Sequence, residues 1–301
     1  MLIATNGLKL PLRDFNGEDI IKVVAGNNMI VAITNNHHIR YIPSNPDLRL
    51  FKLFGPKVID VAISKVYKEL CVGLHEDGTC MLLRGITPEN TRTKNIQEEK
   101  LLWIDDTIRR WRDVIQLAVS DAIFALHIDG TVSCCELSRP FIEPSYGRVQ
   151  CWEGIRKMVV GSQCSVAGIT HEGTILVDGH NLIRNQDRIA KSSKRIDIAD
   201  IILGGSECER ILFLDKEGHI CDFDGEVVYP GIFRDVLGNW DYTLLARDYK
   251  QKLHVLDPGC FHIADEGECE AWGRVSSYAI LNQGFDQGAV VAVCENIREE
   301  S

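Results

Sequence analysis

The sequence predicts an all-β protein, a seven-bladed β-propeller closed into a ring, from a repeat, a recurring turn and two complementary chain ends. Seven large apolar residues each precede a short apolar strand: Phe15, Phe54, Trp111, Trp152, Ile196, Phe233 and Trp272. Their successive separations are 39, 57, 41, 44, 37 and 39 residues. From Trp272 through the C-terminus and round to Phe15 the count is 44, so the repeat closes on itself. A period of about forty residues made of short strands is the sequence signature of a β-propeller.

The strand that follows each anchor residue is expected to lie innermost in its blade. These segments are almost continuously apolar, as in Ile20–Ala25, Val58–Ile63, Ile155–Val160 and Ile201–Leu203. Continuous apolar runs suit strands that neighbouring blades cover on both faces. Their short lengths and β-branched residues favour strand over buried helix.

Hairpin turns follow the second strand of most units. In the third unit, a strand at Ala122–His127 leads through Ile128-Asp129-Gly130 into a return strand at Thr131–Cys135. A carboxylate followed by glycine between apolar runs is a strong hairpin signal, because glycine adopts positive φ without a clash. The same turn recurs at Asp77-Gly78, Glu172-Gly173 and Glu217-Gly218, while the first unit has Asn35-Asn36 and the sixth has the degenerate Asp248–Gln251.

The two chain ends are expected to build the last blade together. Ser276–Leu281 and Gly288–Cys294 supply two inner strands, and Leu2–Leu10 supplies the missing outer material. Pairing of the N-terminal strand with the C-terminal blade shuts the ring and removes sheet edges that invite aggregation. Because no Pro/Gly/Ser-rich linker interrupts the series, residues 1–301 are predicted to form a single propeller domain.

The repeated unit resembles that of the regulator of chromosome condensation (RCC1) family. By position, Gly26, Gly161 and Gly204 or Gly205 match the glycine that ends the family's first strand, and Gly78, Gly130, Gly173 and Gly218 match its turn glycine. The resemblance spans essentially the whole chain and implies an RCC1-like propeller. The family's W-G-x-N tract, its Asn-x-x-Gly-Gln-Leu-Gly exit and its histidine after the first glycine are absent.

Composition and charge limit the kind of partner and the cellular compartment that we expect. The net charge is −10, and nucleic-acid binding depends on basic side chains, so a nucleic-acid partner is disfavoured. The 11 cysteines lack C-x-x-C pairs or regular spacing, which is typical of buried free thiols in a reducing cytoplasm. No apolar run is long enough to cross a bilayer, and Met1–Leu12 lacks the features of a signal peptide. We expect a cytoplasmic monomer with a protein partner.

No arrangement of residues predicts a catalytic, cofactor or metal site. His75, His127 and His171 occupy nearly equivalent places before turn glycines in three units, so they are interpreted as repeat positions spread around the ring. The set Cys260, His262 and Cys269 lacks the close pairs of a structural zinc site. Vicinal Cys134 and Cys135 point to opposite faces of a strand and are interpreted as packing residues. The prediction is a protein that is not an enzyme.

A protein-binding rim is the functional surface that the sequence predicts. Loops that join the first and second strands of each blade gather on one rim of a propeller. Aromatic anchors among polar groups are typical of protein-binding hot spots. The candidate rim residues are Asn28, Tyr67, Trp240, Asp241, Tyr242, Phe285 and Asp286.

The leading functional hypothesis is a non-enzymatic interaction scaffold of the RCC1-like propeller type. One alternative, implied by the resemblance, is a guanine-nucleotide exchange factor for a small GTPase, with the excess of the 57-residue second repeat, Arg84–Arg110, as its wedge. Another alternative is a propeller lyase or hydrolase, which requires several polar side chains, for instance His75, His127 and His171, to converge at the channel mouth.

Overall fold

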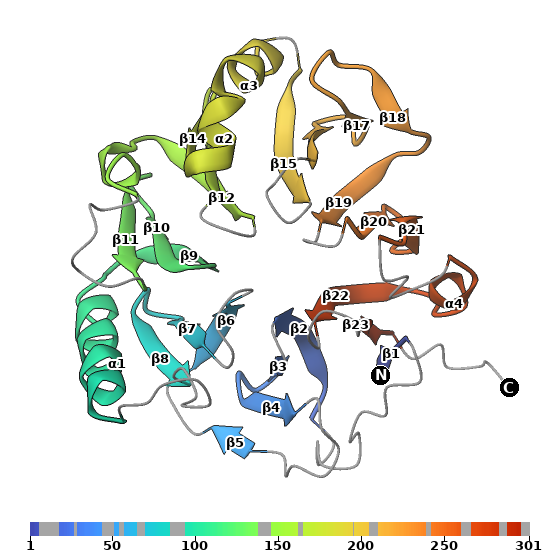
Figure 1. The fold of residues 1–301 in the computed structure, drawn as a ribbon. Coiled ribbons are helices and arrows are strands. Elements are labelled where there is room, and N and C mark those ends of the chain that lie inside the picture. Colours follow the sequence, from blue (N-terminus) through green and yellow to red (C-terminus); the bar gives the residue numbers. More distant parts are fainter. Residues whose placement is uncertain are drawn as a thin grey trace, which may run out of the picture.

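The structure, a computed structural model, describes residues 1–5, 18–26, 29–43, 51–53, 57–64, 70–84, 94–137, 146–161, 165–194, 196–204, 210–238, 242–259, 266–282 and 288–295. Within these ranges the strands form seven antiparallel sheets around one central axis (Figure 1). The predicted seven-bladed β-propeller is therefore confirmed. We number the blades 1 to 7 in chain order, starting from the blade that contains Ile20.

Blades 1 to 4 are formed by strands between Ile20 and Asp178, and each begins with the strand nearest the axis (Figure 1). Blade 1 consists of β2 (Ile20–Gly26), β3 (Met29–Thr34), β4 (Ile39–Pro43) and β5 (Phe51–Leu53). Blade 2 consists of β6 (Val58–Ile63), β7 (Cys71–His75) and β8 (Cys80–Arg84). Blade 3 consists of β9 (Val114–Val119), β10 (Ala122–His127) and β11 (Val132–Glu136). Blade 4 consists of β12 (Ile155–Val160), β13 (Val166–Thr170) and β14 (Ile175–Asp178).

The remaining blades complete the circle. Blade 5 consists of β15 (Ile198–Gly204), β16 (Arg210–Asp215), β17 (Ile220–Cys221) and β18 (Val227–Tyr229). Blade 6 consists of β19 (Phe233–Gly238), β20 (Leu244–Asp248) and β21 (Leu253–Asp257). Blade 7 consists of β22 (Val275–Asn282), β23 (Gly288–Cys294) and β1 (Leu2–Ala4).

The N-terminal strand closes the ring as predicted. β1 pairs antiparallel with β23, with Leu2 opposite Val293. The N-terminal ammonium donates to the Cys294 carbonyl at 2.6 Å, and the amide of Val290 donates to Oγ1 of Thr5 at 2.9 Å. Leu2 is buried between blades 7 and 1. The predicted segment extended to Leu10, whereas the observed strand ends at Ala4 and residues 6–10 lie outside the described residues.

Helices of the described chain lie on the outer flank of the ring (Figure 1). They are α1 (Lys94–Ile108), α2 (His180–Arg184), α3 (Gln186–Ser192) and α4 (Glu266–Glu270). α1 buries Ile104 and Ile108 in the apolar cluster between blades 2 and 3. None of the described helices combines the length and apolar character needed to cross a membrane.

Apolar clusters between neighbouring blades hold the described ring together, and the anchor residues of the repeat lie in them. Trp111 packs between blades 2 and 3, and Trp152 between blades 3 and 4. The same position is taken further round the ring by Ile196, Phe233 and Trp272. Phe15 and Phe54 lie outside the described residues. Burying a large apolar side chain stabilises a fold by about 1.5–3 kcal/mol, so the repeat period reflects one inter-blade contact per unit.

The turn glycines also join neighbouring blades. The carbonyls of Gly78, Gly130 and Gly218 accept hydrogen bonds, at 2.8–3.0 Å, from the first amide of the next inner strand. All three glycines have positive φ, and a Cβ on Gly130 would lie 2.9 Å from the Cα of Gly154. The turn glycines therefore both close the hairpins and bind one blade to the next.

Two hairpins achieve the same geometry without glycine. In blade 1 the positive φ of 59° belongs to His37, and not to Asn35 or Asn36 as the sequence suggested. His37 donates to the Thr34 carbonyl as Gly78 donates to His75, so it occupies the glycine place of the turn. In blade 6 the equivalent residue is Gln251, with φ of 66°, whose carbonyl accepts from the amide of Val275 at 2.7 Å.

Candidate functional site

Every inner strand carries a β-bulge at its start. In blade 1, Ile20 pairs with Thr34 and Lys22 pairs with Ile33, which leaves Ile21 as the extra residue. The equivalent extra residues in the other blades are Ile59, Ile115, Arg156, Ala199, Arg234 and Ser276. Because each inner strand starts where the second strand ends, the bulges and the hairpin turns lie on the same face of the ring. We call this face the turn face.

The residue that follows each bulge is polar. Together these residues form a circle around the axis, which we call the polar girdle: Lys22, Asp60, Gln116, Lys157, Asp200, Asp235 and Ser277. A bulge redirects the side chains next to it. The repeated bulge therefore places polar groups from seven different blades at one height of the ring.

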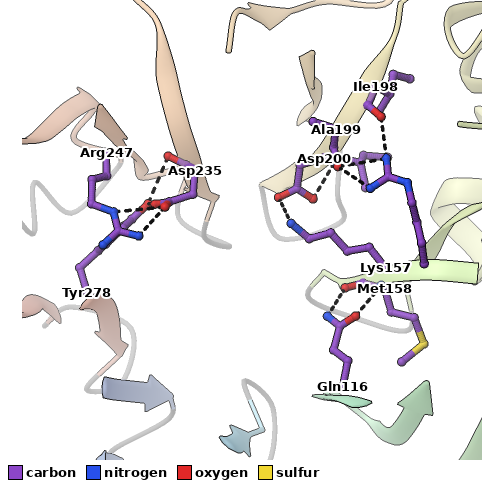
Figure 2. A network of polar contacts seen from close by, with 11 residues as sticks. Gln116, Lys157, Met158, Ile198, Ala199, Asp200, Asp235, Arg247 and Tyr278 are labelled. Carbon is purple, nitrogen blue, oxygen red and sulfur yellow. Dashed lines mark hydrogen bonds and ion pairs between the residues drawn. The ribbon is translucent and has the colours of Figure 1, made fainter. Parts of the chain in front are cut away.

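Two ion pairs of the girdle each connect successive blades. Lys22 Nζ lies 2.6 Å from Asp60 Oδ1. Lys157 Nζ lies 2.5 Å from Asp200 Oδ2 (Figure 2). Asp200 is the more buried of the two carboxylates, and its Oδ1 also accepts from the amide of Ile201 at 2.9 Å. Burial raises the pKa of Asp200, while the Lys157 ammonium opposes the rise. The lysine thus stabilises a charge that the fold otherwise disfavours.

Hydrogen bonds to backbone groups also connect neighbouring blades at the same height. The Gln116 side chain donates to the carbonyl of Met158 at 2.8 Å and accepts from its amide at 2.9 Å (Figure 2). Ser277 Oγ accepts from the amide of Val23 at 3.1 Å. Arg156, the extra residue of blade 4, donates to the carbonyl of Ile198 at 2.7 Å. The girdle therefore satisfies backbone groups of the next inner strand as well as its own charges.

Asp235 is the most heavily engaged carboxylate of the girdle. It accepts from Arg247 Nη2 at 2.5 Å and from the Tyr278 hydroxyl at 2.8 Å (Figure 2). Arg247 also donates to the backbone carbonyls of Val275 and Ser276 in blade 7. Burial, followed by the Asp235 carboxylate, raises the pKa of Tyr278 well above its ordinary range, so the phenol remains a hydrogen-bond donor.

The inner strands enclose a central channel. A cavity of about 400 Å³ is lined mainly by apolar residues of the inner strands, among them Val24, Ile63 and Leu203. A second hollow of about 400 Å³ adjoins the girdle and includes Lys22, Arg247 and Ile21. The channel thus has an apolar interior and a polar collar at the turn face, and the charges of that collar contact one another.

Exposed isoleucines lie beside this collar in three successive blades. Ile21, Ile59 and Ile115 are the bulge residues of blades 1, 2 and 3, and Ile128 stands in the hairpin turn of blade 3. We call these four residues the isoleucine arc. β2, β6 and β9 are neighbours around the axis (Figure 1).

The predicted rim is only partly within the described chain. Asn28, Tyr67, Trp240, Asp241, Phe285 and Asp286 lie outside the described residues. Tyr242 is half-buried and has φ of 70°. Its carbonyl accepts from Arg210 at 3.1 Å, and Arg210 also lies 2.6 Å from Asp257. The rim stays a prediction.

The three histidines singled out from the sequence do not converge. His75, His127 and His171 stand in three different blades, and none of them lines the two hollows at the channel. His127 bonds to the Arg112 carbonyl and to Ser133, whereas His171 is exposed. Burial raises the pKa of the Cys135 thiol to about 12 and that of Cys134 further. Both thiols therefore stay protonated at neutral pH.

The cysteine–histidine set and the excess of the second repeat lie only partly within the described chain. Cys260 and His262 lie outside the described residues, and Cys269 packs in the cluster between blades 6 and 7. The Arg84–Arg110 excess contains α1, which packs against the flank of blades 2 and 3. There Asp105 accepts a hydrogen bond from the amide of Leu82 at 3.2 Å. Residues 85–93, which also belong to the proposed wedge, lie outside the described residues.

Sequence reasoning missed both the girdle and the isoleucine arc. The sequence pattern of the inner strands is almost continuously apolar, although a polar residue recurs two places after the first residue of each strand. Ile-Ile-Lys22, Val-Ile-Asp60 and Val-Ile-Gln116 carry that signal in blades 1 to 3. Alignment of the repeats at this position would have shown the circle of polar residues and the isoleucine before three of them.

No protein-family model and no curated protein matches the sequence. Among solved structures, the chain is similar to Hsv2 of Kluyvelomyces marxianus, with a TM-score of 0.51 and 11% identity over 91% of this chain and 89% of that chain. Prp20p of Saccharomyces cerevisiae, the yeast RCC1, gives a TM-score of 0.42 and 11% identity over 92% of this chain and 69% of that chain. That structure was described together with the binding of Prp20p to Gsp1p and histones. At 11% identity the similarity to Hsv2 supports the propeller fold alone, and the resemblance of the repeats to the RCC1 family stays a resemblance.

Proposed function

We propose that this chain is a non-enzymatic protein-binding propeller that holds its partner on the turn face, over the channel mouth. The observation that carries the proposal is the isoleucine arc. Exposed apolar side chains gathered on one sector of a surface mark sites of protein association. In this chain the three bulge isoleucines are held by backbone ladders of neighbouring blades, so a partner meets them already positioned.

The polar girdle supports a binding role over a catalytic one. A general acid or base needs a titratable group that can reach a substrate. Lys22, Lys157 and Arg247 instead lie against carboxylates of the girdle. The network fits a structural task, which is to keep the blades in register around the channel.

The loop-bearing rim on the opposite face remains a second candidate surface. It rests on the aromatic and acidic residues named from the sequence, of which only Tyr242 lies in the described chain. A test of function must therefore examine both faces.

Site-specific photocrosslinking in cells distinguishes the two faces. A benzophenone amino acid replaces exposed Lys57 on the turn face in one variant and Tyr242 on the other face in a second variant. We expect a discrete protein adduct from position 57, identified by mass spectrometry. The adduct should disappear when Ile21→Ser, Ile59→Ser and Ile115→Ser are combined.

The matched control is Val227→Ser with Val228→Ser, which removes exposed apolar side chains from β18. It should leave the adduct unchanged. An adduct only from position 242 would move the binding site to the predicted rim. No adduct from either position would contradict a protein-binding role for these surfaces.

A further inference from the structure

The isoleucine arc is confined to one sector of the turn face. Ile21, Ile59 and Ile115 are 47, 41 and 49% exposed, and Ile128 is 73% exposed. Single exposed apolar residues are ordinary on protein surfaces, but these occupy equivalent or adjoining places on three successive blades. In the other four blades the bulge position holds Arg156, Ala199, Arg234 and Ser276. The bulge therefore does not require isoleucine, and the arc is the run of such residues on three successive blades; the turn face of blade 6 also exposes Ile232 and Tyr249.

Ionised carboxylates border the arc. Asp77 and Asp129 are exposed in the hairpin turns of blades 2 and 3. Oδ1 of Asp77 accepts from the hydroxyl and amide of Thr79 at 2.6 and 3.0 Å, and Oδ1 of Asp129 accepts from those of Thr131 at 2.7 and 2.9 Å. These hydrogen bonds lower the pKa of both carboxyl groups. Two negative charges are thus fixed beside the apolar surface at neutral pH.

The basic residues of this sector are already engaged with other groups. The contacts are Lys22 with Asp60, Lys57 with Glu76, Arg109 with Asp105, and Arg112 with the backbone carbonyls of Arg109 and Trp111. In the described part of the chain, neither Asp77 nor Asp129 takes part in an ion pair. Arg112 donates to uncharged carbonyls, so its positive charge stands beside the two negative charges of Asp77 and Asp129, and the balance of these three is negative, as is the net charge of −10.

We infer that the partner presents a segment in which apolar side chains are flanked by lysine or arginine. The apolar side chains contact Ile21, Ile59 and Ile115, and the basic side chains reach the carboxylates of Asp77 and Asp129. Complementary charge speeds encounter and rejects acidic segments, while the apolar contact supplies affinity. This inference rests on the proposed function and specifies the chemistry of the partner.

Three labelled peptides of equal length test the inference by fluorescence anisotropy with the full chain. One alternates lysine and leucine, one replaces every lysine by glutamate, and one replaces every leucine by serine. We expect the lysine–leucine peptide to bind at least about tenfold more tightly than either of the others. Its affinity should fall as salt is added, because exposed charges are screened.

Variants of the chain assign that binding to the arc. Combining Ile21→Ser, Ile59→Ser and Ile115→Ser should weaken the lysine–leucine peptide about tenfold or more. Asp77→Asn with Asp129→Asn should weaken it about threefold and flatten its salt dependence. The control pair Val227→Ser and Val228→Ser should change nothing. Thermal melts monitored by circular dichroism verify that each variant is folded.

Peptide binding can overturn the inference in two ways. One is equal binding of the glutamate–leucine peptide; the other is binding of the lysine–leucine peptide that the arc variant does not weaken. Self-association of the wild-type chain in sedimentation, lost in the arc variant, would also overturn it, because the occupant would then be a second copy. If position 57 crosslinks to a partner but the lysine–leucine peptide does not bind, the proposed function stands and only the inferred apolar and basic character of the partner segment is refuted. Absence of any crosslink refutes the proposed function itself.

Discussion

Glycine is favoured at the hairpin turns for two separate reasons, and the chain allows them to be separated. Gly130 and Gly173 occupy equivalent turns of blades 3 and 4, with φ of 81° and 85°. A Cβ on Gly130 would lie 2.9 Å from the Cα of Gly154 and from the amide of Ile155. No atom of the described chain lies within 4 Å of a Cβ placed on Gly173. Backbone strain acts at both positions, but the collision with the next blade acts at Gly130.

Replacement by alanine should therefore have unequal effects at these two turns. Gly173→Ala should lower the free energy of unfolding by about 1 kcal/mol, which is the cost of a left-handed conformation. Gly130→Ala should cost about 1–3 kcal/mol more, because the turn must move away from β12. Urea unfolding followed by tryptophan fluorescence measures both. Equal losses would show that the close approach is relieved without cost.

The histidine before the blade 2 turn should make stability depend on pH. Burial lowers the pKa of His75, an effect to which Arg109 adds and which Asp77 opposes. The unfolded chain takes up a proton near the ordinary value of 6.5, whereas the folded chain does so only at lower pH. The free energy of unfolding should therefore decrease as the pH falls below that value.

Threonine provides the matched substitution at this position, because Thr170 occupies the equivalent place in blade 4. His75→Thr should flatten the decrease in unfolding free energy between about pH 7 and pH 5. Unfolding titrations at several pH values measure the slope. An unchanged slope would mean that the ring of His75 does not produce the acid sensitivity.

At the scale of the strand, the bulge and the polar residue after it form one device. The inner strands are covered by neighbouring blades, so a polar side chain there requires a partner on the next strand. Lys157 and Asp200 supply such a pair between β12 and β15, and Lys22 and Asp60 supply another between β2 and β6. The two pairs differ in burial, since the side chain of Asp60 is 29% exposed and that of Asp200 is 11% exposed.

Removal of the lysines should reveal that difference. Lys157→Met leaves Asp200 charged and buried, and at neutral pH it should cost about 1–3 kcal/mol. Because the raised pKa of Asp200 should rise further, the carboxyl group becomes protonated as the pH falls and the cost should shrink. Lys22→Met should cost less, because Asp60 keeps contact with water. Chemical unfolding of each variant at two pH values tests the comparison.

A second substitution separates charge from packing at this pair. Lys157→Met combined with Asp200→Asn removes both charges and should recover part of the lost stability. No recovery would indicate that the lysine acts through the packing of its side chain and not through its charge.

Across the whole molecule, the sequence predicted the ring and left most of the surface unassigned. Anchor residues such as Trp111 and Trp152 were found because one large apolar residue per unit packs between two blades. The roles of Lys22 and Asp60 were not predicted, because a single polar residue in a short apolar strand forms no pattern within that strand. The isoleucine arc was not predicted either, because Ile21 or Ile59 taken alone is expected to be a core residue. The surface becomes visible only when blades distant in sequence are superposed.

Closure of the ring is the property of the whole molecule that a mutation can test. Leu2→Ala should lower the free energy of unfolding by about 2–4 kcal/mol, since Leu2 is buried between blades 7 and 1. Deletion of residues 1–4 should cost more and expose the edge of β23, which favours aggregation. Urea unfolding and light scattering report the two effects. Val227→Ala on exposed β18 is the control, and an equal change there would contradict the role of closure.

The pairing of β1 with β23 also sets the order in which the molecule can be completed. Leu2–Ala4 are made before every other described strand of the propeller, and Gly288–Cys294, the strand with which they pair, is made after the others. Blades 1 to 6 can therefore assemble during synthesis, before blade 7 joins blade 6 to blade 1. Until Gly288–Cys294 has been made, the growing propeller is an open arc with two unprotected ends, and those ends are where chaperones would be needed.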